Sequence, residues 1–330
     1  MARVLIKDIA NKLGVSVSTV SNVINGKKGR VGDVLTEKIK NEAAAMNYKP
    51  NAFAKALRKG RSETIGLIIS DISNPFFGEL AFHVQENAEK HGYSIIFTNT
   101  NESPEKMRKM ISILKDRNVD GFIIVPTNDS EEAIQQLVEE KYPIVLLDRY
   151  CKGIDTSHVV VNNYQASKAA INLLLNMKCK RIMAIGLFSD GLQTMIDRKN
   201  GCIDAMTNKG LYDPELIKDV KFNTIGDDIK KVMTDLVCSS ETIDGIFFAN
   251  STTCINAMKI LISLKLEIPK NIKIVCFDKS DFFQLMNASI PYIDQPIPEM
   301  GKRAVELLIN HITNKDMPCV YEELQAVLKW

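Results

Sequence analysis

The sequence is poor in the residues that build disulfide frameworks, metal sites and membrane spans. Its seven cysteines are odd in number and scattered without a C-x-x-C pair, which argues against a disulfide framework or zinc site and fits a reducing compartment. No apolar run approaches the roughly 18–20 residues of a transmembrane helix, and no signal peptide opens the chain. The four histidines lack ligand-like spacing. We therefore expect a cytoplasmic protein without a metal site or a membrane association.

Motifs that carry common enzyme chemistry are also missing. Neither G-x-S-x-G nor H-E-x-x-H occurs. The stretch "GLFSDGLQ" has the glycine spacing of a phosphate-binding loop, but Leu192 and Gln193 stand where that loop needs Lys and Ser or Thr. We expect no catalytic residues and no cofactor.

What the sequence does have is an uneven distribution of charge. The 330 residues, 45% hydrophobic and 25% charged, suit a globular protein of two or three domains. Residues 1–61 contain 13 Lys or Arg against 4 Asp or Glu, a balance of +9, and the rest contain 29 against 36, a balance of −7. This division indicates that the basic head meets a polyanion. A solvated basic arm would carry the same charge, but the periodic apolar residues of the head favour a folded unit.

Two short helices joined by a tight turn are predicted in this head. In "IKDIANKLG" the apolar residues share one face and Gly14 ends the helix, and Ser16 is placed to cap the next helix. That second helix buries Val20, Val23 and Ile24 and presents short uncharged polar side chains, namely Ser18, Ser21, Asn22 and Asn25. Such a face suits the major groove of DNA, where Asn pairs with adenine, Ser with either base and Val17 with a thymine methyl. With a third helix at about 34–47, the pattern predicts a helix-turn-helix.

These residues resemble the N-terminus of a known family. The stretch "IKDIANKLGVSVSTVSNVINGK", with "RVGDVLTEKI" and "NYKPNAFAKALRKGRSETIGLIISDISNPFFGEL" after it, is similar to the LacI/GalR family of bacterial transcriptional repressors, and the resemblance covers essentially the whole chain. In the family, the positions of Val17, Ser18 and Asn22 choose the operator. The positions of Thr19 and Ser21 hold phosphates.

The segment at 50–62, "PNAFAKALRKGRS", is helix-capable but too short to be stable alone. It is compatible with an ordinary charged linker. The resemblance instead implies a hinge helix that enters the minor groove beside that of a dimer mate, with Leu57 wedged between central base pairs. It assigns DNA contacts to four residues of this segment: Asn51, Ala54, Lys55 and Leu57.

From residue 64 onward, short apolar runs alternate with helical segments. These runs fall into two sets, and their apolar composition is typical of buried parallel strands. The first set is "TIGLIIS", "SIIFTNT", "GFIIVP" and "PIVLLDR", and the second is "RIMAIGL", "DVKFN", "GIFFAN" and "IKIVCFD". We expect two doubly wound α/β lobes with a ligand between them. The resemblance implies a type I periplasmic-binding-protein fold. The expected divisions are 1–49 for the DNA-binding domain, 50–62 for the hinge, and 63–330 for the effector domain, with lobe 1 at about 63–161 and 294–320 and lobe 2 at about 162–293.

Polar and aromatic residues follow the predicted strands. Aromatic rings suit the C–H faces of a sugar, and Asp, Asn and Arg can each bond two neighbouring hydroxyls. Taken alone, each of these polar or aromatic residues has an ordinary structural interpretation. Taken together, the residues resemble the sugar-binding site of periplasmic ribose-type binding proteins. The candidate effector residues are Asn74, Phe76, Phe77, Asp148, Arg149, Arg198, Phe222, Asn250, Asp278 and Gln295. Ser251 departs from the Asp common in repressors at that position.

The sequence thus predicts a homodimeric DNA-binding repressor of α/β class, with an all-α head. A small sugar of ribose, ketohexose or sugar-acid type is expected to control its affinity for a pseudo-palindromic operator allosterically. A sugar-binding protein without a DNA role is the alternative, which the basic head disfavours.

Overall fold

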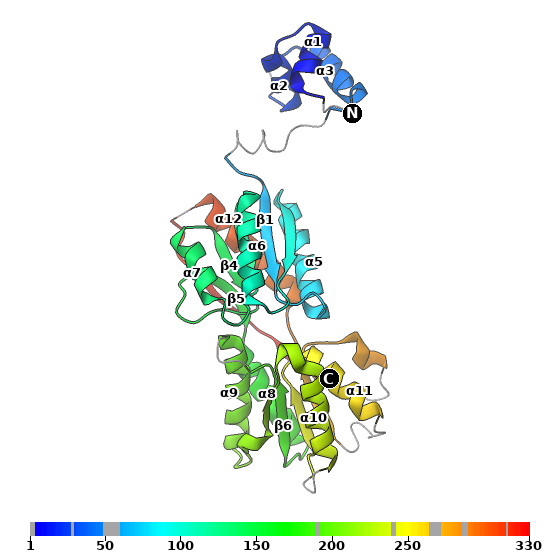
Figure 1. The fold of residues 1–330 in the computed structure, drawn as a ribbon, viewed down its shortest axis with the longest axis vertical. Helices are drawn as coiled ribbons and strands as arrows, with labels where there is room; N and C mark the ends of the chain where they lie inside the picture. The colour runs from blue at the N-terminus through cyan, green and yellow to red at the C-terminus, as the bar shows by residue number, and fades with distance from the viewer. Residues whose placement is uncertain are drawn as a thin grey trace. The chain divides into compact units, whose positions relative to one another are not determined.

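The computed structural model describes residues 4–27, 30–48, 60–188, 192–238, 242–263, 272–285, 290–314 and 316–330. The chain forms two compact units, Met1–Ser62 and Glu63–Trp330 (Figure 1). None of the helices in these ranges is long and apolar enough to cross a membrane.

The small unit contains α1 (Ile6–Leu13), α2 (Val17–Ile24) and α3 (Asp33–Ala45). Gly14 ends α1 with φ 63°, a conformation that glycine adopts without steric cost, and the Ser16 hydroxyl caps α2 by accepting a 3.0 Å hydrogen bond from the Thr19 N–H. Ile9, Val20 and Ile39, one from each helix, are fully buried in a common core. The predicted helix-turn-helix with a third helix is confirmed.

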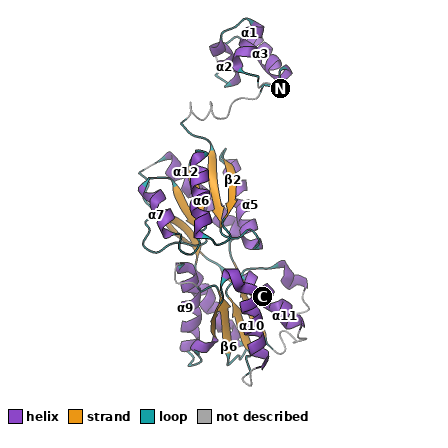
Figure 2. Ribbon diagram, viewed as in Figure 1, coloured by secondary structure: helices purple, strands orange, loops and turns teal. Residues whose placement is uncertain are grey.

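The large unit consists of two α/β lobes (Figure 2). Lobe 1 is built on a sheet of β1 (Thr64–Ile69), β2 (Ser94–Asn99), β3 (Gly121–Ile124), β4 (Ile144–Leu147), β5 (Ser157–Val161) and β11 (Tyr321–Leu324). Its helices are α5 (Pro75–Lys90), α6 (Pro104–Asp116), α7 (Glu131–Glu139) and α12 (Ile297–Thr313). Helices α5 and α12 pack together, as do α6 and α7, so both faces of the sheet are covered.

Lobe 2 repeats this plan. Its sheet contains β6 (Ile182–Gly186), β7 (Ile217–Asp219), β8 (Gly245–Phe248), β9 (Lys273–Phe277), β10 (Tyr292–Asp294) and β12 (Val327–Lys329). Its α-helices are α8 (Asn163–Asn176), α9 (Gln193–Thr207), α10 (Ile225–Cys238) and α11 (Ser251–Ser263), and its 3₁₀ turns are Pro214–Leu216, Phe222–Thr224 and Asp281–Leu285.

The two sheets have matching strand orders, β2-β1-β3-β4-β5-β11 and β7-β6-β8-β9-β10-β12. All described pairings are parallel except the antiparallel pair β10–β12. In each sheet the chain order reverses beside the first strand, the position where doubly wound folds bind ligands at the carboxyl ends of the strands. The two α/β lobes predicted from the sequence are confirmed.

Some strands differ from the sequence prediction. The run "DVKFN" is not a strand throughout: β7 ends at Asp219, and Phe222 begins a 3₁₀ turn. Strands β11 and β12 lie beyond the predicted end of lobe 1 at about 320, one in each sheet. The chain therefore passes between the lobes three times, near residues 162, 295 and 325.

Candidate functional site

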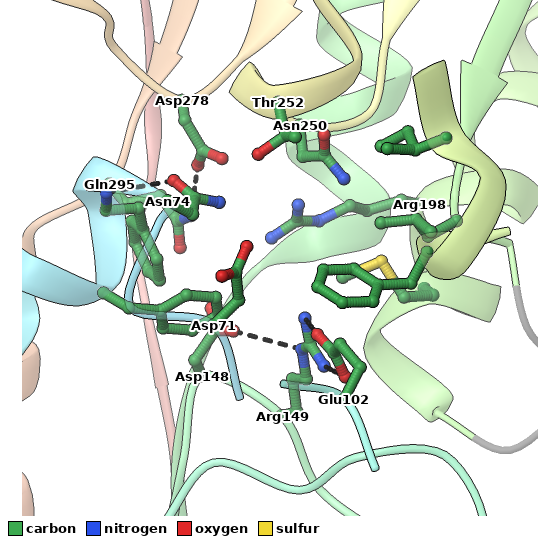
Figure 3. A pocket seen from close by; sticks show the side chains of 16 residues that line it. Asp71, Asn74, Glu102, Asp148, Arg149, Arg198, Asn250, Thr252, Asp278 and Gln295 are labelled. Carbon is green, nitrogen blue, oxygen red and sulfur yellow. Dashed lines mark hydrogen bonds and ion pairs between the residues drawn. The ribbon is translucent and has the colours of Figure 1, made fainter. Parts of the chain in front are cut away.

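A pocket that is partly open to solvent lies between the carboxyl ends of the strands of the two lobes. All ten candidate effector residues line it, together with Asp71, Glu102, Leu187, Met195, Ile225 and Thr252 (Figure 3). Residues from both sheets converge here because equivalent strand ends of the two lobes face each other.

Two asparagines at helix starts direct amide groups to the pocket. Asn74 caps α5, its Oδ1 accepting the Phe76 N–H at 3.1 Å, and Asn250 Oδ1 accepts the Thr253 N–H at 2.8 Å at the start of α11. With these oxygens occupied, the side-chain NH₂ groups remain as donors for a ligand. The Ser251 hydroxyl donates to Asn74 Oδ1 at 3.4 Å and links the two lobes.

Two aspartates occupy equivalent positions after β4 and β9. Asp148 and Asp278 both have positive φ, 65° and 79°, and their N–H groups donate to Val159 and Ile293 of the neighbouring strands at 2.9 and 3.1 Å. Asp278 Oδ1 accepts from Gln295 Nε2 at 2.5 Å. Among the described residues that line the pocket, Asp148 Oδ1, Gln295 Oε1 and Arg149 Nε are buried without a hydrogen-bond partner. Buried polar atoms are rarely left so, which marks the two oxygens as acceptors for a ligand.

Burial governs the acidity of both aspartates. It raises the pKa of Asp148 to about 6, although Arg149 and Arg198 act in the opposite direction. Burial also raises the pKa of Asp278, again opposed first by Arg198. A ligand hydroxyl that donates to these carboxylates would favour their ionised form.

The two pocket arginines are held differently. Arg149 forms a two-point ion pair with Glu102, at 2.9 and 2.8 Å, and donates to the Pro126 carbonyl at 3.2 Å. Arg198 donates from Nε to Asn163 Oδ1 at 2.6 Å and from Nη1 to the Ala249 carbonyl at 2.8 Å. No described carboxylate forms an ion pair with Arg198, so its charge is available to a ligand, whereas that of Arg149 is neutralised by Glu102.

The aromatic rings of the pocket come from both lobes. Phe76 and Phe77 meet edge to face with centroids 5.1 Å apart, and the Arg149 guanidinium lies 5.5 Å from the Phe77 ring. Phe222, on the 3₁₀ turn after β7, lines the pocket from lobe 2. The pocket thus combines apolar aromatic faces with hydrogen-bond donors and acceptors. This combination suits a sugar, which has apolar C–H faces and polar hydroxyl groups.

A second candidate surface is the outward face of α2. Val17 is 51% exposed, Ser18 is exposed, and Thr19, Ser21 and Asn22 are partly exposed, while Val20 and Val23 are buried in the core. The Ser16 hydroxyl contacts the hydroxyls of Ser18 and Thr19 at 2.7 and 2.8 Å. Within the described residues the Asn22 carboxamide makes no side-chain hydrogen bond. The helix thus offers short polar groups to a partner.

Comparison with known proteins gives both units a family. Residues 5–51 match the family model described as bacterial regulatory proteins, lacI family, and residues 65–316 match a periplasmic binding protein domain. The chain is 32% identical to the ribose operon repressor of Halalkalibacterium halodurans over 98% of its own length and 95% of that protein's. The chain belongs to the LacI family of bacterial regulatory proteins. It is a transcriptional regulator with a DNA-binding head.

Solved structures support the assignment of this LacI-family regulator. A putative ribose operon repressor from Burkholderia thailandensis is similar with 28% identity and a TM-score of 0.73, over 82% of this chain and 99% of that one. A LacI-type regulator from Alkaliphilus metalliredigens, solved with D-xylulofuranose, has 26% identity and a TM-score of 0.69, over 81% and 97%. The first is thus named as a repressor, and the second as a periplasmic binding protein or LacI transcriptional regulator.

Sequence reasoning missed six residues that line the pocket of the regulator. Asp71 and Glu102 also follow strands, β1 and β2, so the strand-end signal that found the other polar residues would have found them. Thr252 immediately follows Asn250 and Ser251. The apolar Leu187, Met195 and Ile225 carry no such signal. The predicted DNA contacts Asn51, Ala54, Lys55 and Leu57 lie outside the described residues.

Proposed function

We propose that this regulator binds a small neutral sugar in the pocket between its lobes, and that the sugar controls the affinity of the head for operator DNA. The observation that carries the proposal is the convergence of ten residues of sugar-binding chemistry, with two buried acceptors, Asp148 Oδ1 and Gln295 Oε1, left for a ligand. The ribose operon repressors among the relatives and the D-xylulofuranose in one similar structure support a pentose or a ketose.

The charge of the pocket favours a neutral sugar over a sugar acid. Four carboxylates line the pocket against two guanidinium groups, and Glu102 already neutralises Arg149. An anionic ligand would therefore meet Asp148 and Asp278 with Arg198 as the one pocket guanidinium that no described carboxylate pairs, since Arg149 Nε also lies 3.5 Å from Asp148 Oδ2. Calorimetric titration with pentoses, ketohexoses and hexuronates tests the proposal. Tight binding of a pentose or ketohexose is expected, and exclusive binding of a hexuronate would contradict it.

Sugar binding should be coupled to release of a proton from Asp148. Because burial raises its pKa to about 6, this carboxyl is partly protonated near pH 6 and mainly ionised at pH 7.5. A sugar hydroxyl that donates to it requires the ionised form, so sugar affinity should fall up to about tenfold per pH unit below 6. At pH 6, calorimetry in buffers of different ionisation heats should detect the proton. The Asp148→Asn variant should lose this dependence; its persistence there would point to another group.

The outward face of α2 is proposed to bind the major groove of a pseudo-palindromic operator. Val17, Ser18 and Asn22 would contact bases, and Thr19 and Ser21 would hold phosphates. The hinge contacts proposed for Asn51, Ala54, Lys55 and Leu57 in the minor groove complete the interface. We propose a cytoplasmic location, which a DNA-binding role supports, and the LacI head disfavours a sugar-binding protein without a DNA role.

Replacement of Asn22 should relax sequence preference at one symmetric operator position. Removing a bidentate contact to a base costs about 1–3 kcal/mol of discrimination, so Asn22→Ala should bind operators that vary at that position almost equally. Binding to a library of operator variants measures the effect. Asn11→Ala, at an exposed position on α1, is the control and should retain the preference. A uniform loss over all sequences would make Asn22 a positioning contact.

We propose that the regulator is a homodimer joined partly through lobe 1. Strand β2 is at the edge of its sheet, and its exposed Phe97 (40%) accompanies exposed Phe82 (62%) on α5, which packs beside β2. An uncovered edge strand with exposed aromatic residues favours pairing with a second copy.

Charge placed on this surface should separate the subunits. Phe82→Glu is expected to produce a monomer by sedimentation velocity and, since a palindromic operator needs two heads, to weaken operator binding strongly. Val237→Glu, at a similarly exposed position in lobe 2, is the matched control. A dimeric Phe82→Glu variant would place the interface elsewhere.

A further inference from the structure

The Arg198 guanidinium depends on a residue outside the pocket lining. Arg198 is 2% exposed, and its Cζ lies 3.6 Å from the centre of the Phe277 ring. Among the described residues, Arg198 donates to the Ala249 carbonyl and to the side chain of Asn163, which accepts from Nε at 2.6 Å. Asn163 is therefore the side chain that orients the guanidinium by hydrogen bonding.

Asn163 also contacts the segment that joins the lobes. It is the first residue of α8, it is 2% exposed, and its Nδ2 donates to the carbonyl of Val161, the last residue of β5, at 2.9 Å. Both polar atoms of its carboxamide are thus engaged, one with the pocket arginine and one with the first crossing between lobes.

The preceding residue extends this connection to the third crossing. Asn162 Nδ2 donates to Gln325 Oε1, and Asn162 Oδ1 accepts from the Ala326 N–H, both at 2.8 Å. The Asn162 N–H donates to the Leu324 carbonyl at 3.0 Å. Two adjacent residues, Asn163 and Asn162, therefore connect the Arg198 guanidinium to two of the three segments that join the lobes, each through its own hydrogen bonds and with the peptide bond between them.

We infer that Asn163 is a positioning residue that fixes Arg198 for the ligand and links its placement to the arrangement of the lobes. This inference rests on the proposed function of the pocket as a sugar site. A neutral carboxamide suits the role because it fixes the guanidinium without cancelling its charge. An aspartate at 163 would form a buried ion pair with Arg198 and compete with the ligand for it.

Two substitutions in the full-length protein test the inference, with D-ribose and D-xylulose as probes. Asn163→Leu removes the acceptor and leaves the buried Arg198 Nε–H unpaired, so sugar affinity should fall at least about tenfold. Asn163→Asp keeps an acceptor for Arg198 and a similar volume but loses the donor to the Val161 carbonyl, and it should also weaken sugar binding by competing for the guanidinium. Asn172→Leu, at an exposed position on α8, is the matched control and should bind sugar as the wild type does.

The ratio of operator affinities with and without sugar distinguishes a loss of Arg198 positioning from a general loss of protein stability. In both Asn163 variants, saturating sugar should change the operator affinity by a smaller factor than it does in the wild type. Unchanged sugar affinity in folded Asn163→Asp would overturn the inference, even if Asn163→Leu failed to fold. If the wild type bound neither probe but another sugar of the panel, that sugar replaces them. Failure of the wild type to bind any sugar would instead overturn the proposed function, and this inference with it.

Discussion

The Asp278→Asn variant should lose sugar binding by about 2–5 kcal/mol, roughly thirty- to several-thousandfold in affinity, while it still binds operator. Asp278 is buried at the end of β9, accepts from Gln295 and faces Arg198 across the pocket. The amide cannot accept as two charged oxygens do, and it leaves Arg198 with less negative charge nearby. Asparagine tolerates the positive φ of 79°, so the backbone should not be strained.

The operator response of this variant separates the two sites of the regulator. Its DNA-binding head is unaltered, so if the sugar is an inducer, Asp278→Asn should remain on the operator at sugar concentrations that release the wild type. Asp281→Asn, an exposed carboxylate three positions further on, should respond as the wild type does. A variant at 278 with full sugar response would place the effector outside this pocket.

Operator affinity should fall by about a thousandfold or more between 50 and 200 mM salt, as expected when six or more phosphates are neutralised. Residues 1–61 carry a balance of +9, and a dimer brings two such heads to the DNA. The remaining chain, with a balance of −7, would repel the phosphates, so the attraction must come from the heads.

Sugar binding provides an internal control for this salt effect. A neutral sugar in a buried pocket releases no counterions, so its affinity should stay nearly constant over the same salt range. Fluorescence anisotropy of labelled operator and calorimetry of the sugar measure the two properties on one preparation. An operator affinity that hardly changes with salt would contradict binding through the basic head.

Much of the pocket could be predicted because strand ends have a recognisable sequence. Short apolar runs ended by polar residues, as in "LLDRY" and "CFDKS", placed Asp148 and Asp278 correctly at the carboxyl ends of β4 and β9. What the sequence could not show is how these groups pair. The two-point contact of Arg149 with Glu102 joins loops 47 residues apart, so Arg149 was expected to bind hydroxyls although an ion pair already holds it.

The strands that the sequence failed to reveal are short or polar. Strand β11, "YEEL", and β12, "VLK", contain no apolar run, because β11 lies at a sheet edge and β12 pairs with only the three residues of β10. In "DVKFN" the alternation of Val220 and Phe222 mimics a strand, but Val220 packs in the lobe core while Phe222 turns toward the pocket. Tertiary packing, not local pattern, decides these elements.

The most direct test of the account is a titration of the full-length protein on its own upstream DNA with and without the sugar that calorimetry identifies. We expect one saturable complex on a pseudo-palindromic site, and a change of at least about fivefold in operator affinity when the sugar saturates the pocket. The same sugar should have no effect on the operator affinity of Asp278→Asn. An operator affinity of the wild type that is identical with and without bound sugar would contradict the claim that this pocket controls DNA binding.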